Sequence, residues 1–349
     1  MPLKKLELKS GVNRENTRYT SEGGWYECDK IRFRQGTPEK IGGWQRISQS
    51  VFQGVCRSIW NWVTLGSQNL VGLGTNLKFY IENGGGYYDI TPLRKAAATL
   101  TNPFTTVSGS ATVTVTDATG GYIVGDFVTF SNASAVGGLT IDGEFQVVDL
   151  SSATSYTITA SSNATSAATG GGTVTAEYQI NVGPAFAIPL VGWGASSWGS
   201  GTWGIGAESV EEVRQWSQAN FGEDLIFGPR GGTLFYWDAS ATNSLSVRGV
   251  ALSSVVGASN VPTIQNLTLV SDISRFVFCF GCNELGSASL NTMLIRWSDQ
   301  EDATNWTPSA TNQSGDLILS NGTNIIAAKQ SRQEVLVWTD SALYALQYV

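Results

Sequence analysis

Residues 224–237 read DLIFGPRGGTLFYW, and this stretch decides the fold class. An apolar run leads into a Pro-Arg-Gly-Gly turn at 229–232, and a second apolar run ends in three aromatic residues at 235–237. Strand-forming residues on both sides of a glycine-containing turn predict an antiparallel hairpin. The chain has 40 glycines among 349 residues, which supply many more such turns. Short strands joined by turns along the whole chain are typical of an all-β protein.

The same hairpin pattern recurs at residues 69–81, 275–297 and 334–348, each time with aromatic residues in the second strand. The turns near residues 231, 292 and 341 lie 61 and 49 residues apart. A propeller blade is a unit of about 40–50 residues with four strands. We therefore expect a β-propeller-like platform of about four blades in residues 49–96 and 179–349. The sequence stops inside an apolar strand, which favours a part of a longer protein over an open ring.

Residues 97–178 interrupt this pattern, because their composition changes to Ala, Thr, Ser, Gly and Val. Strict alternation predicts strands at 111–115, 126–130, 143–148, 155–159 and 172–177. Five or six short alternating strands form a small β-barrel or β-sandwich, so we interpret this segment as a domain inserted into a loop of the first blade. No Lys or Arg occurs between Ala96 and Val213, whereas nine acidic residues do.

Residues 1–48 are expected to form an extended N-terminal arm with a hairpin whose turn lies at 35–38. Ten Lys or Arg and six Asp or Glu give residues 1–50 a net charge of +4, although the whole chain has a net charge of −7. A basic arm on an acidic body suits assembly between subunits or onto an acidic partner. The alternative is an edge hairpin that caps a neighbouring sheet. The basic residues that we expect to contact a partner are Lys4, Lys5, Lys9, Arg14 and Arg18.

Residues 192–206 read GWGASSWGSGTWGIG, with Trp193, Trp198 and Trp203 five residues apart. A spacing of five fits neither a helix nor a strand, so we expect a loop that carries large apolar side chains. Exposed tryptophans are typical of a contact surface. The alternative is that the three rings fold back as a local cap on the propeller.

The composition argues against enzymatic chemistry. The chain has no histidine, which removes the commonest general base and metal ligand. Cys279 and Cys282 form a CxxC motif, but a zinc site needs a second such pair, so we expect buried thiols. Strand geometry places these two cysteines on opposite faces unless Gly281 bends the chain. Cys28 and Cys56 are single cysteines in a chain without a predicted signal peptide or membrane span, so we expect reduced thiols.

The densest acidic cluster is Asp299, Glu301 and Asp302. Paired carboxylates serve glycosidases and calcium sites, but this spacing matches no EF-hand loop. We expect a solvated loop between blades, and we predict no catalytic residue, no metal and no cofactor.

Three parts of the sequence resemble a known family. Residues 25–44 (WYECDKIRFRQGTPEKIGGW), residues 295–308 (IRWSDQEDATNWTP) with 312–317 (NQSGDL), and the tryptophan loop resemble tail nozzle proteins of short-tailed bacteriophages. This family of head–tail connector proteins is also known as the DNA-stabilisation type. The resemblance covers both ends of the chain and the propeller part, and it does not extend to residues 97–178.

The resemblance implies a β-propeller subunit of a viral tail, made in the host cytoplasm and present in six copies in a ring. That homohexamer lies below the portal and adaptor proteins, contacts tail fibres or spikes, and does not insert into a membrane. Its lumen conducts the genomic DNA during ejection, and a gate retains the DNA until then. An acidic chain suits this role, because every Lys or Arg contact to phosphate adds affinity and drag.

Two other functions compete with this structural role. A propeller lectin would use Trp193, Trp198, Trp203 or blade tryptophans to bind host glycans, although lectin blades usually are nearly identical and these are not. A carboxylate-only glycosidase would use Asp299, Glu301 and Asp302, and Glu301→Gln would then abolish hydrolysis. The resemblance and the composition favour a non-enzymatic virion protein.

Overall fold

The chain is all-β in a computed structural model that describes residues 9–15, 17–20, 23–43, 45–46, 48–183, 213 and 215–348. These residues form 26 strands and two short 3-10 turns, η1 (Ser244–Ser246) and η2 (Leu252–Ser254). All strand pairs are antiparallel, and no sheet in these ranges closes into a barrel. None of the described segments is a helix that could cross a membrane. The chain packs as two separate units, residues 1–49 and 50–349.

The first unit contains the predicted hairpin of the arm. It consists of β1 (Ile31–Arg34) and β2 (Thr37–Lys40), with Arg34 paired to Thr37. Gln35 and Gly36 between them have φ angles of 49° and 81°. Positive φ at both central residues is the geometry of the tight hairpin turn that matches strand twist. No hydrophobic residue is fully buried among the described positions 9–46. The described positions of the arm therefore contain no buried hydrophobic core.

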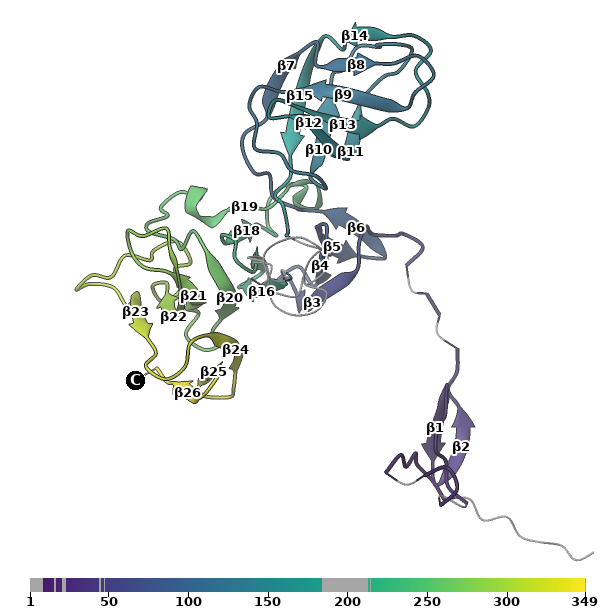
Figure 1. Ribbon diagram of the computed structural model, residues 1–349. Helices are drawn as coiled ribbons and strands as arrows, with labels where there is room; N and C mark the ends of the chain where they lie inside the picture. The colour runs from purple at the N-terminus through teal and green to yellow at the C-terminus, as the bar shows by residue number, and fades with distance from the viewer. Residues whose placement is uncertain are drawn as a thin grey trace, which may run out of the picture. The chain divides into compact units, whose positions relative to one another are not determined.

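The second unit contains four meandering sheets in chain order, visible from purple to yellow in Figure 1. The first sheet comprises β3 (Cys56–Val63), β4 (Asn69–Thr75), β5 (Phe79–Asn83) and β6 (Gly86–Asp89). The second sheet comprises β16 (Trp216–Phe221), β17 (Asp224–Pro229), β18 (Phe235–Trp237) and β19 (Val250–Ala251). The third sheet comprises β20 (Gln265–Val270), β21 (Val277–Asn283), β22 (Leu290–Trp297) and β23 (Gly315–Ile318). The fourth sheet comprises β24 (Ile325–Gln330), β25 (Val335–Thr339) and β26 (Leu343–Leu346).

The first strands of these sheets lie next to one another in chain order. Gln218 on β16 donates a hydrogen bond from Nε2 to Ser58 Oγ on β3 at 2.7 Å. The backbone N–H of Thr268 on β20 donates to Ser217 Oγ at 3.0 Å. β24 in turn packs against β20. The ammonium of Lys329 on β24 lies 5.9 Å from the ring centre of Trp60 on β3. The four sheets therefore lie in chain order with their first strands in contact.

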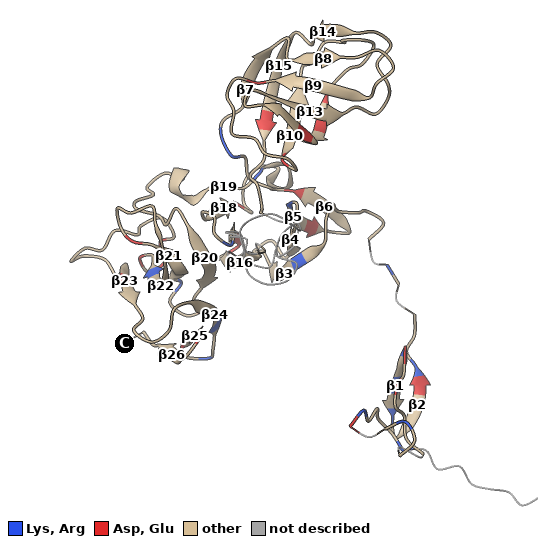
Figure 2. Cartoon of the chain, viewed as in Figure 1, with Lys and Arg blue, Asp and Glu red and all other residues tan. Residues whose placement is uncertain are grey.

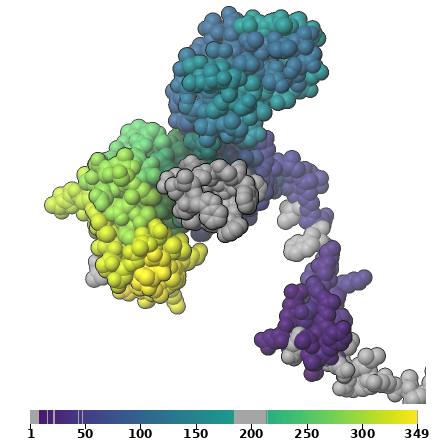
Figure 3. Space-filling view, viewed as in Figure 1, coloured from purple at the N-terminus to yellow at the C-terminus, as the bar shows by residue number. Residues whose placement is uncertain are grey.

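Apolar side chains fill the spaces between successive sheets. Phe79 of the first sheet lies 4.3 Å from Phe227 and 4.9 Å from Trp216 of the second sheet, measured between ring centres. Phe280 of the third sheet and Val337 of the fourth belong to another shared core, and both are fully buried. Figure 3 shows the yellow residues of the fourth sheet packed directly against the yellow-green residues of the third.

Residues 98–178 form two sheets that share one hydrophobic core, and we call them the sandwich. The first of these sheets has the order β11 (Gly143–Gln146), β10 (Phe127–Ser131), β15 (Thr173–Tyr178), β7 (Ala98–Thr101). The second has the order β12 (Asp149–Ser152), β13 (Ser155–Thr159), β9 (Thr112–Thr116), β8 (Phe104–Thr106), β14 (Ala168–Gly170).

Alternation in the sequence decides which side chains enter the sandwich core. On β9, Val113 and Val115 are fully buried, whereas the threonines between and beside them face outward. Tyr156 on β13 and Phe130 on β10 come from opposite sheets into the same core. Of the two alternatives that the sequence left open, the structure shows a β-sandwich. Its strands carry acidic side chains and no basic ones, as Figure 2 shows.

Candidate functional site

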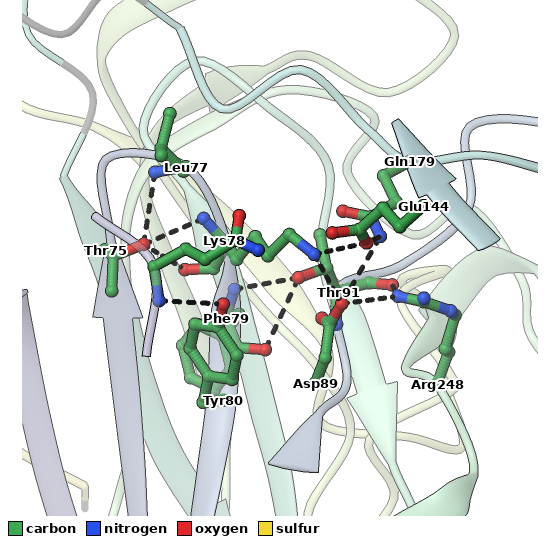
Figure 4. Close-up of polar contacts among 11 residues, drawn as sticks. Thr75, Leu77, Lys78, Phe79, Tyr80, Asp89, Thr91, Glu144, Gln179 and Arg248 are labelled. Carbon is green, nitrogen blue, oxygen red and sulfur yellow. Dashed lines mark hydrogen bonds and ion pairs between the residues drawn. The ribbon is translucent and has the colours of Figure 1, made fainter. Parts of the chain in front are cut away.

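A charged cluster joins the sandwich to the first two sheets, and we call Lys78, Asp89, Glu144, Gln179 and Arg248 the junction cluster (Figure 4). Lys78 directly precedes β5, where Thr75 Oγ1 accepts a hydrogen bond from its backbone N–H at 2.8 Å. From this turn the lysine side chain extends toward Asp89 and Glu144 (Figure 4). Its side chain is only 3% exposed. A buried ammonium requires charged or polar partners, because the loss of hydration is costly.

Lys78 has three partners. Its ammonium lies 3.0 Å from Asp89 Oδ2 at the end of β6, and it also pairs with Glu144 Oε2 on β11 of the sandwich. The same ammonium lies 4.7 Å from the ring centre of Phe127 on β10. Gln179 donates from Nε2 to Glu144 Oε2 at 2.8 Å. One lysine beside the first sheet therefore contacts two strands of the sandwich, β10 and β11.

Arg248, which precedes β19 of the second sheet, is the second cation of the cluster. Its Nη1 lies 3.3 Å from Asp89 Oδ2 and donates to the backbone oxygen of Thr91 at 2.9 Å. Burial acts to raise the pKa of Asp89, but the charges of Arg248 and Lys78 and hydrogen bonds from Thr91 outweigh it, so this pKa lies below its usual value. Two cations and two carboxylates balance one another, which is the condition for keeping such charges out of water.

A second ion pair strengthens the same junction. Arg94, in the segment that leads into the sandwich, donates from Nη1 to Asp126 Oδ2 at 3.0 Å. Asp126 is buried, and its other oxygen accepts a hydrogen bond from Asn181 at 2.8 Å. The guanidinium of Arg94 also lies 5.3 Å from the ring centre of Tyr178. The segments that lead into and out of the sandwich are thus tied to its base.

The charged groups of the junction cluster pair with one another. Its carboxylates are each engaged by a cation or an amide. Among the described residues, no group of three or more Cys, Asp or Glu could hold a metal ion. Sequence reasoning missed this cluster, because Lys78 and Glu144 are 66 residues apart. The available signal was a single lysine within the apolar run at 77–81.

The basic residues predicted to contact partners fall into two groups. Lys4 and Lys5 lie outside the described residues, and Lys9 is exposed. Arg14 and Arg18 lie 3.1 and 3.7 Å from the carboxylate of Glu27, and both guanidiniums lie over the ring of Tyr26. Such exposed ion pairs are weak, so they leave these arginines able to exchange partners. Their role in partner contact stays a prediction.

The tryptophan loop predicted as a contact surface lies outside the described residues. This includes Trp193, Trp198 and Trp203.

The acidic residues Asp299, Glu301 and Asp302 lie in a loop that follows β22, and the two aspartates accept hydrogen bonds within that loop. Asp299 Oδ1 accepts backbone hydrogen bonds from Gln300 at 2.8 Å and from Gln313 at 2.9 Å. Asp302 Oδ1 accepts hydrogen bonds from the backbone N–H and from the hydroxyl of Thr304, at 2.8 and 2.6 Å. Glu301 occupies the turn with a φ of 56°, the left-handed conformation. These carboxylates stabilise a loop, as carboxylates commonly do in turns.

The CxxC motif lies in the core between the second and third sheets. Gly281 has a φ of 58°, and the strand register shifts between Phe280 and Cys282. This bulge places Cys279 and Cys282 in one buried core and Phe280 in another. Burial raises the pKa of Cys279 well above its usual value and that of Cys282 to about 12. Such thiols are poor nucleophiles and poor metal ligands, as expected for buried cysteines.

Comparisons with known proteins do not identify a family. No family profile and no curated protein sequence matches this chain. Among solved structures, the phage phi92 endosialidase aligns with 86% of this chain and 43% of its own length, at 14% identity and a TM-score of 0.23. The chain thus corresponds to less than half of that protein. A likeness this distant defines neither fold nor function.

Proposed function

We propose that this chain is a structural subunit of a bacteriophage tail, of the nozzle or head–tail connector type. The observation that carries the proposal is the arm, a separately packed hairpin without a buried hydrophobic residue among its described positions. An isolated two-stranded hairpin is at best marginally stable in water. A partner surface that covers Trp25, Tyr26 and Phe33 would supply the missing burial.

The charge distribution supports assembly. The arm is basic, and the sandwich has no basic residue. Complementary charges of this kind orient subunits as they meet. We propose that the arm docks onto a neighbouring copy or onto an acidic portal or adaptor surface, and that six copies form the ring. Tail fibres or spikes would attach to the outside of this ring.

The platform suits a conduit. Four sheets with adjoining first strands resemble consecutive propeller blades, which form rigid bodies around a central axis. The inserted sandwich, held by the junction cluster, would keep a fixed position as DNA passes. An acidic subunit repels phosphate, so genomic DNA would move through the lumen without specific binding. The site of action is therefore the tail of the virion, and no catalytic step is part of this function.

Electron microscopy of single particles tests the proposal. We would image the full chain alone and mixed with the portal–adaptor complex of its virus, and count subunits around any ring. A six-fold ring with an open axial channel is expected, either alone or only on the portal complex. A monomer that does not bind the portal complex would contradict the proposal.

A matched pair of variants tests the arm. Arg14→Glu with Arg18→Glu reverses two arm charges and should prevent ring formation. Arg275→Glu with Arg332→Glu reverses two exposed charges of the third and fourth sheet regions and should leave the ring intact. Equal assembly of both variants would show that the charge of the arm has no role.

A further inference from the structure

A groove of about 470 Å³ lies between the third and fourth sheets. One wall comes from the segment before β21 and from β21, β22 and β23, and the other from the end of β24, from β25 and from the residues around β26. This volume falls within the range of about 300–1,000 Å³ that small ligands occupy in protein pockets. The side chains used below are Phe276, Phe278, Trp297, Gln313, Gln330, Gln333, Glu334 and Tyr348.

Aromatic rings form the apolar part of the groove, and hydrogen bonds and ring contacts orient them. Trp297 donates from Nε1 to the backbone oxygen of Gln313 at 2.7 Å. Tyr348 donates from its hydroxyl to Oε1 of the same glutamine at 3.1 Å. The ring centres of Phe276 and Tyr348 are 5.5 Å apart, and those of Phe278 and Trp297 are 6.3 Å apart. Gln313 therefore holds two aromatic side chains in place before any ligand arrives.

Glycine at position 315 permits the position of the indole. Gly315 pairs with Trp297 across the strands, and a Cβ atom there would lie 2.5 Å from Trp297 Cζ2. The indole of Trp297 thus packs directly against the backbone of Gly315. A rigid aromatic surface loses little conformational entropy on binding, which favours affinity.

Side-chain amides form the polar part. Gln330 donates from Nε2 to the backbone oxygen of Ser331 at 2.8 Å. Its Oε1 is buried and has no hydrogen-bond partner among the described residues. A buried acceptor without a donor is costly, so a ligand hydroxyl that reached it would gain the bond. Gln333 adds a further amide, and amides offer both donors and acceptors.

The charge of the groove selects the class of ligand. Among the described residues that line it, Glu334 is the one charged side chain, and there is no Lys or Arg. Phosphates, sulfates and anionic sugars would meet repulsion without a compensating cation. A pyranose presents an apolar C–H face that packs on aromatic rings and hydroxyl groups that exchange hydrogen bonds with amides. A wholly apolar ligand would leave the amides unpaired.

We propose that this groove binds a neutral oligosaccharide. The binding goes beyond the structural role proposed above and does not depend on it, because it uses one chain and no arm contact. A tail subunit with such a groove would contact neutral glycans of the host surface.

Calorimetric titration of the full chain tests the proposal. The probes are neutral trisaccharides of glucose, galactose, mannose and N-acetylglucosamine, with sialyllactose as the anionic comparison. At least one neutral sugar is expected to bind, and sialyllactose is expected to bind more weakly. Tyr348→Ala truncates a residue that is 58% exposed, and it should raise the dissociation constant by about tenfold or more. Tyr88→Ala removes an exposed tyrosine outside the groove and should change it by less than about twofold.

Gln333→Ala provides a second variant that retains every aromatic ring, and it should also weaken binding. Binding by none of the four neutral sugars would overturn the proposal. So would tighter binding of sialyllactose, or equal affinities of wild type and Tyr348→Ala. If light scattering instead showed a dimer that Tyr348→Ala dissociates, the groove would be an interface between copies, and the proposal would be wrong.

Discussion

The indole of Trp216 on β16 occupies the space beside Gly74 on β4. A Cβ atom at position 74 would lie 2.5 Å from Trp216 Cδ1, and the indole Nε1 donates to the backbone oxygen of Thr75 at 2.7 Å. The ring also contacts Phe79. Trp216 thereby fixes the second sheet against the first, and the absence of a side chain at Gly74 makes this close approach possible.

Gly74→Ala should therefore destabilise the protein. The added methyl group forces Trp216 or the strand to move, and such overpacking costs about 2 kcal/mol. Chemical denaturation, followed by tryptophan fluorescence, measures the change in the free energy of unfolding. Gly66→Ala, in the β3–β4 turn where no atom is closer than 3.7 Å, is the matched control and should be nearly neutral. Equal stability of the two variants would show that the sheets can shift freely.

Lys78→Met should destabilise the junction. The substitution retains most of the apolar stem but leaves Glu144 without its cation, and breaking a buried ion pair costs about 3 kcal/mol. The low end of that range is expected, since Asp89 and Glu144 are 22% and 25% exposed. Urea denaturation measures it, with Lys30→Met, which alters a lysine that is 79% exposed, as the control. A loss equal to that of the control would mean that the cluster does not hold the sandwich.

Acid should weaken the same junction. The folded pKa of Asp89 lies below its ordinary value of 3.8, so its carboxylate stabilises the fold above that pH. This contribution is lost as the pH falls from 3.8 through the folded pKa. Asp89→Asn cannot titrate, so its free energy of unfolding should fall less steeply below pH 3.8 than that of wild type. Parallel curves for the two proteins would contradict the lowered pKa.

The four cysteines should differ in reactivity. Cys56 is exposed, whereas Cys279 and Cys282 are buried with raised pKa values. Only the thiolate reacts with alkylating reagents, so brief iodoacetamide treatment at pH 8 should modify Cys56 and spare the CxxC pair. Peptide mass spectrometry identifies the modified sites, and labelling in urea provides the control. Rapid native labelling of Cys279 would show that this core opens.

The sequence predicts the all-β class and several hairpins, because alternation and turn chemistry are local properties. Val113 and Val115 face the sandwich core as their spacing indicates. The strand β12 (Asp149–Ser152) was not predicted. All four of its residues are exposed, and a single leucine among polar residues gives no periodic pattern. Pairing with β13, not propensity, makes this segment a strand.

Distant contacts explain what the sequence did not predict. The ion pair of Lys78 with Glu144 depends on how the sandwich meets the first sheet, which no local pattern specifies. Cys279 and Cys282 share one core because of the bulge at Gly281. From the sequence, we could say only that the two cysteines would lie on opposite faces unless this glycine bends the chain. The resemblance to nozzle proteins and the division into arm, propeller and inserted domain stay predictions.

The segments that lead into and out of the sandwich lie side by side. Arg94 donates its backbone N–H to the oxygen of Tyr178 at 2.8 Å, and Ile180 donates to Pro92 at 3.0 Å. A segment with adjacent ends can be shortened or exchanged without stretching its host. We therefore expect that another segment with adjacent ends can replace residues 98–178, on one chemical condition. Any replacement must bring a carboxylate to Lys78, or that lysine must change with it.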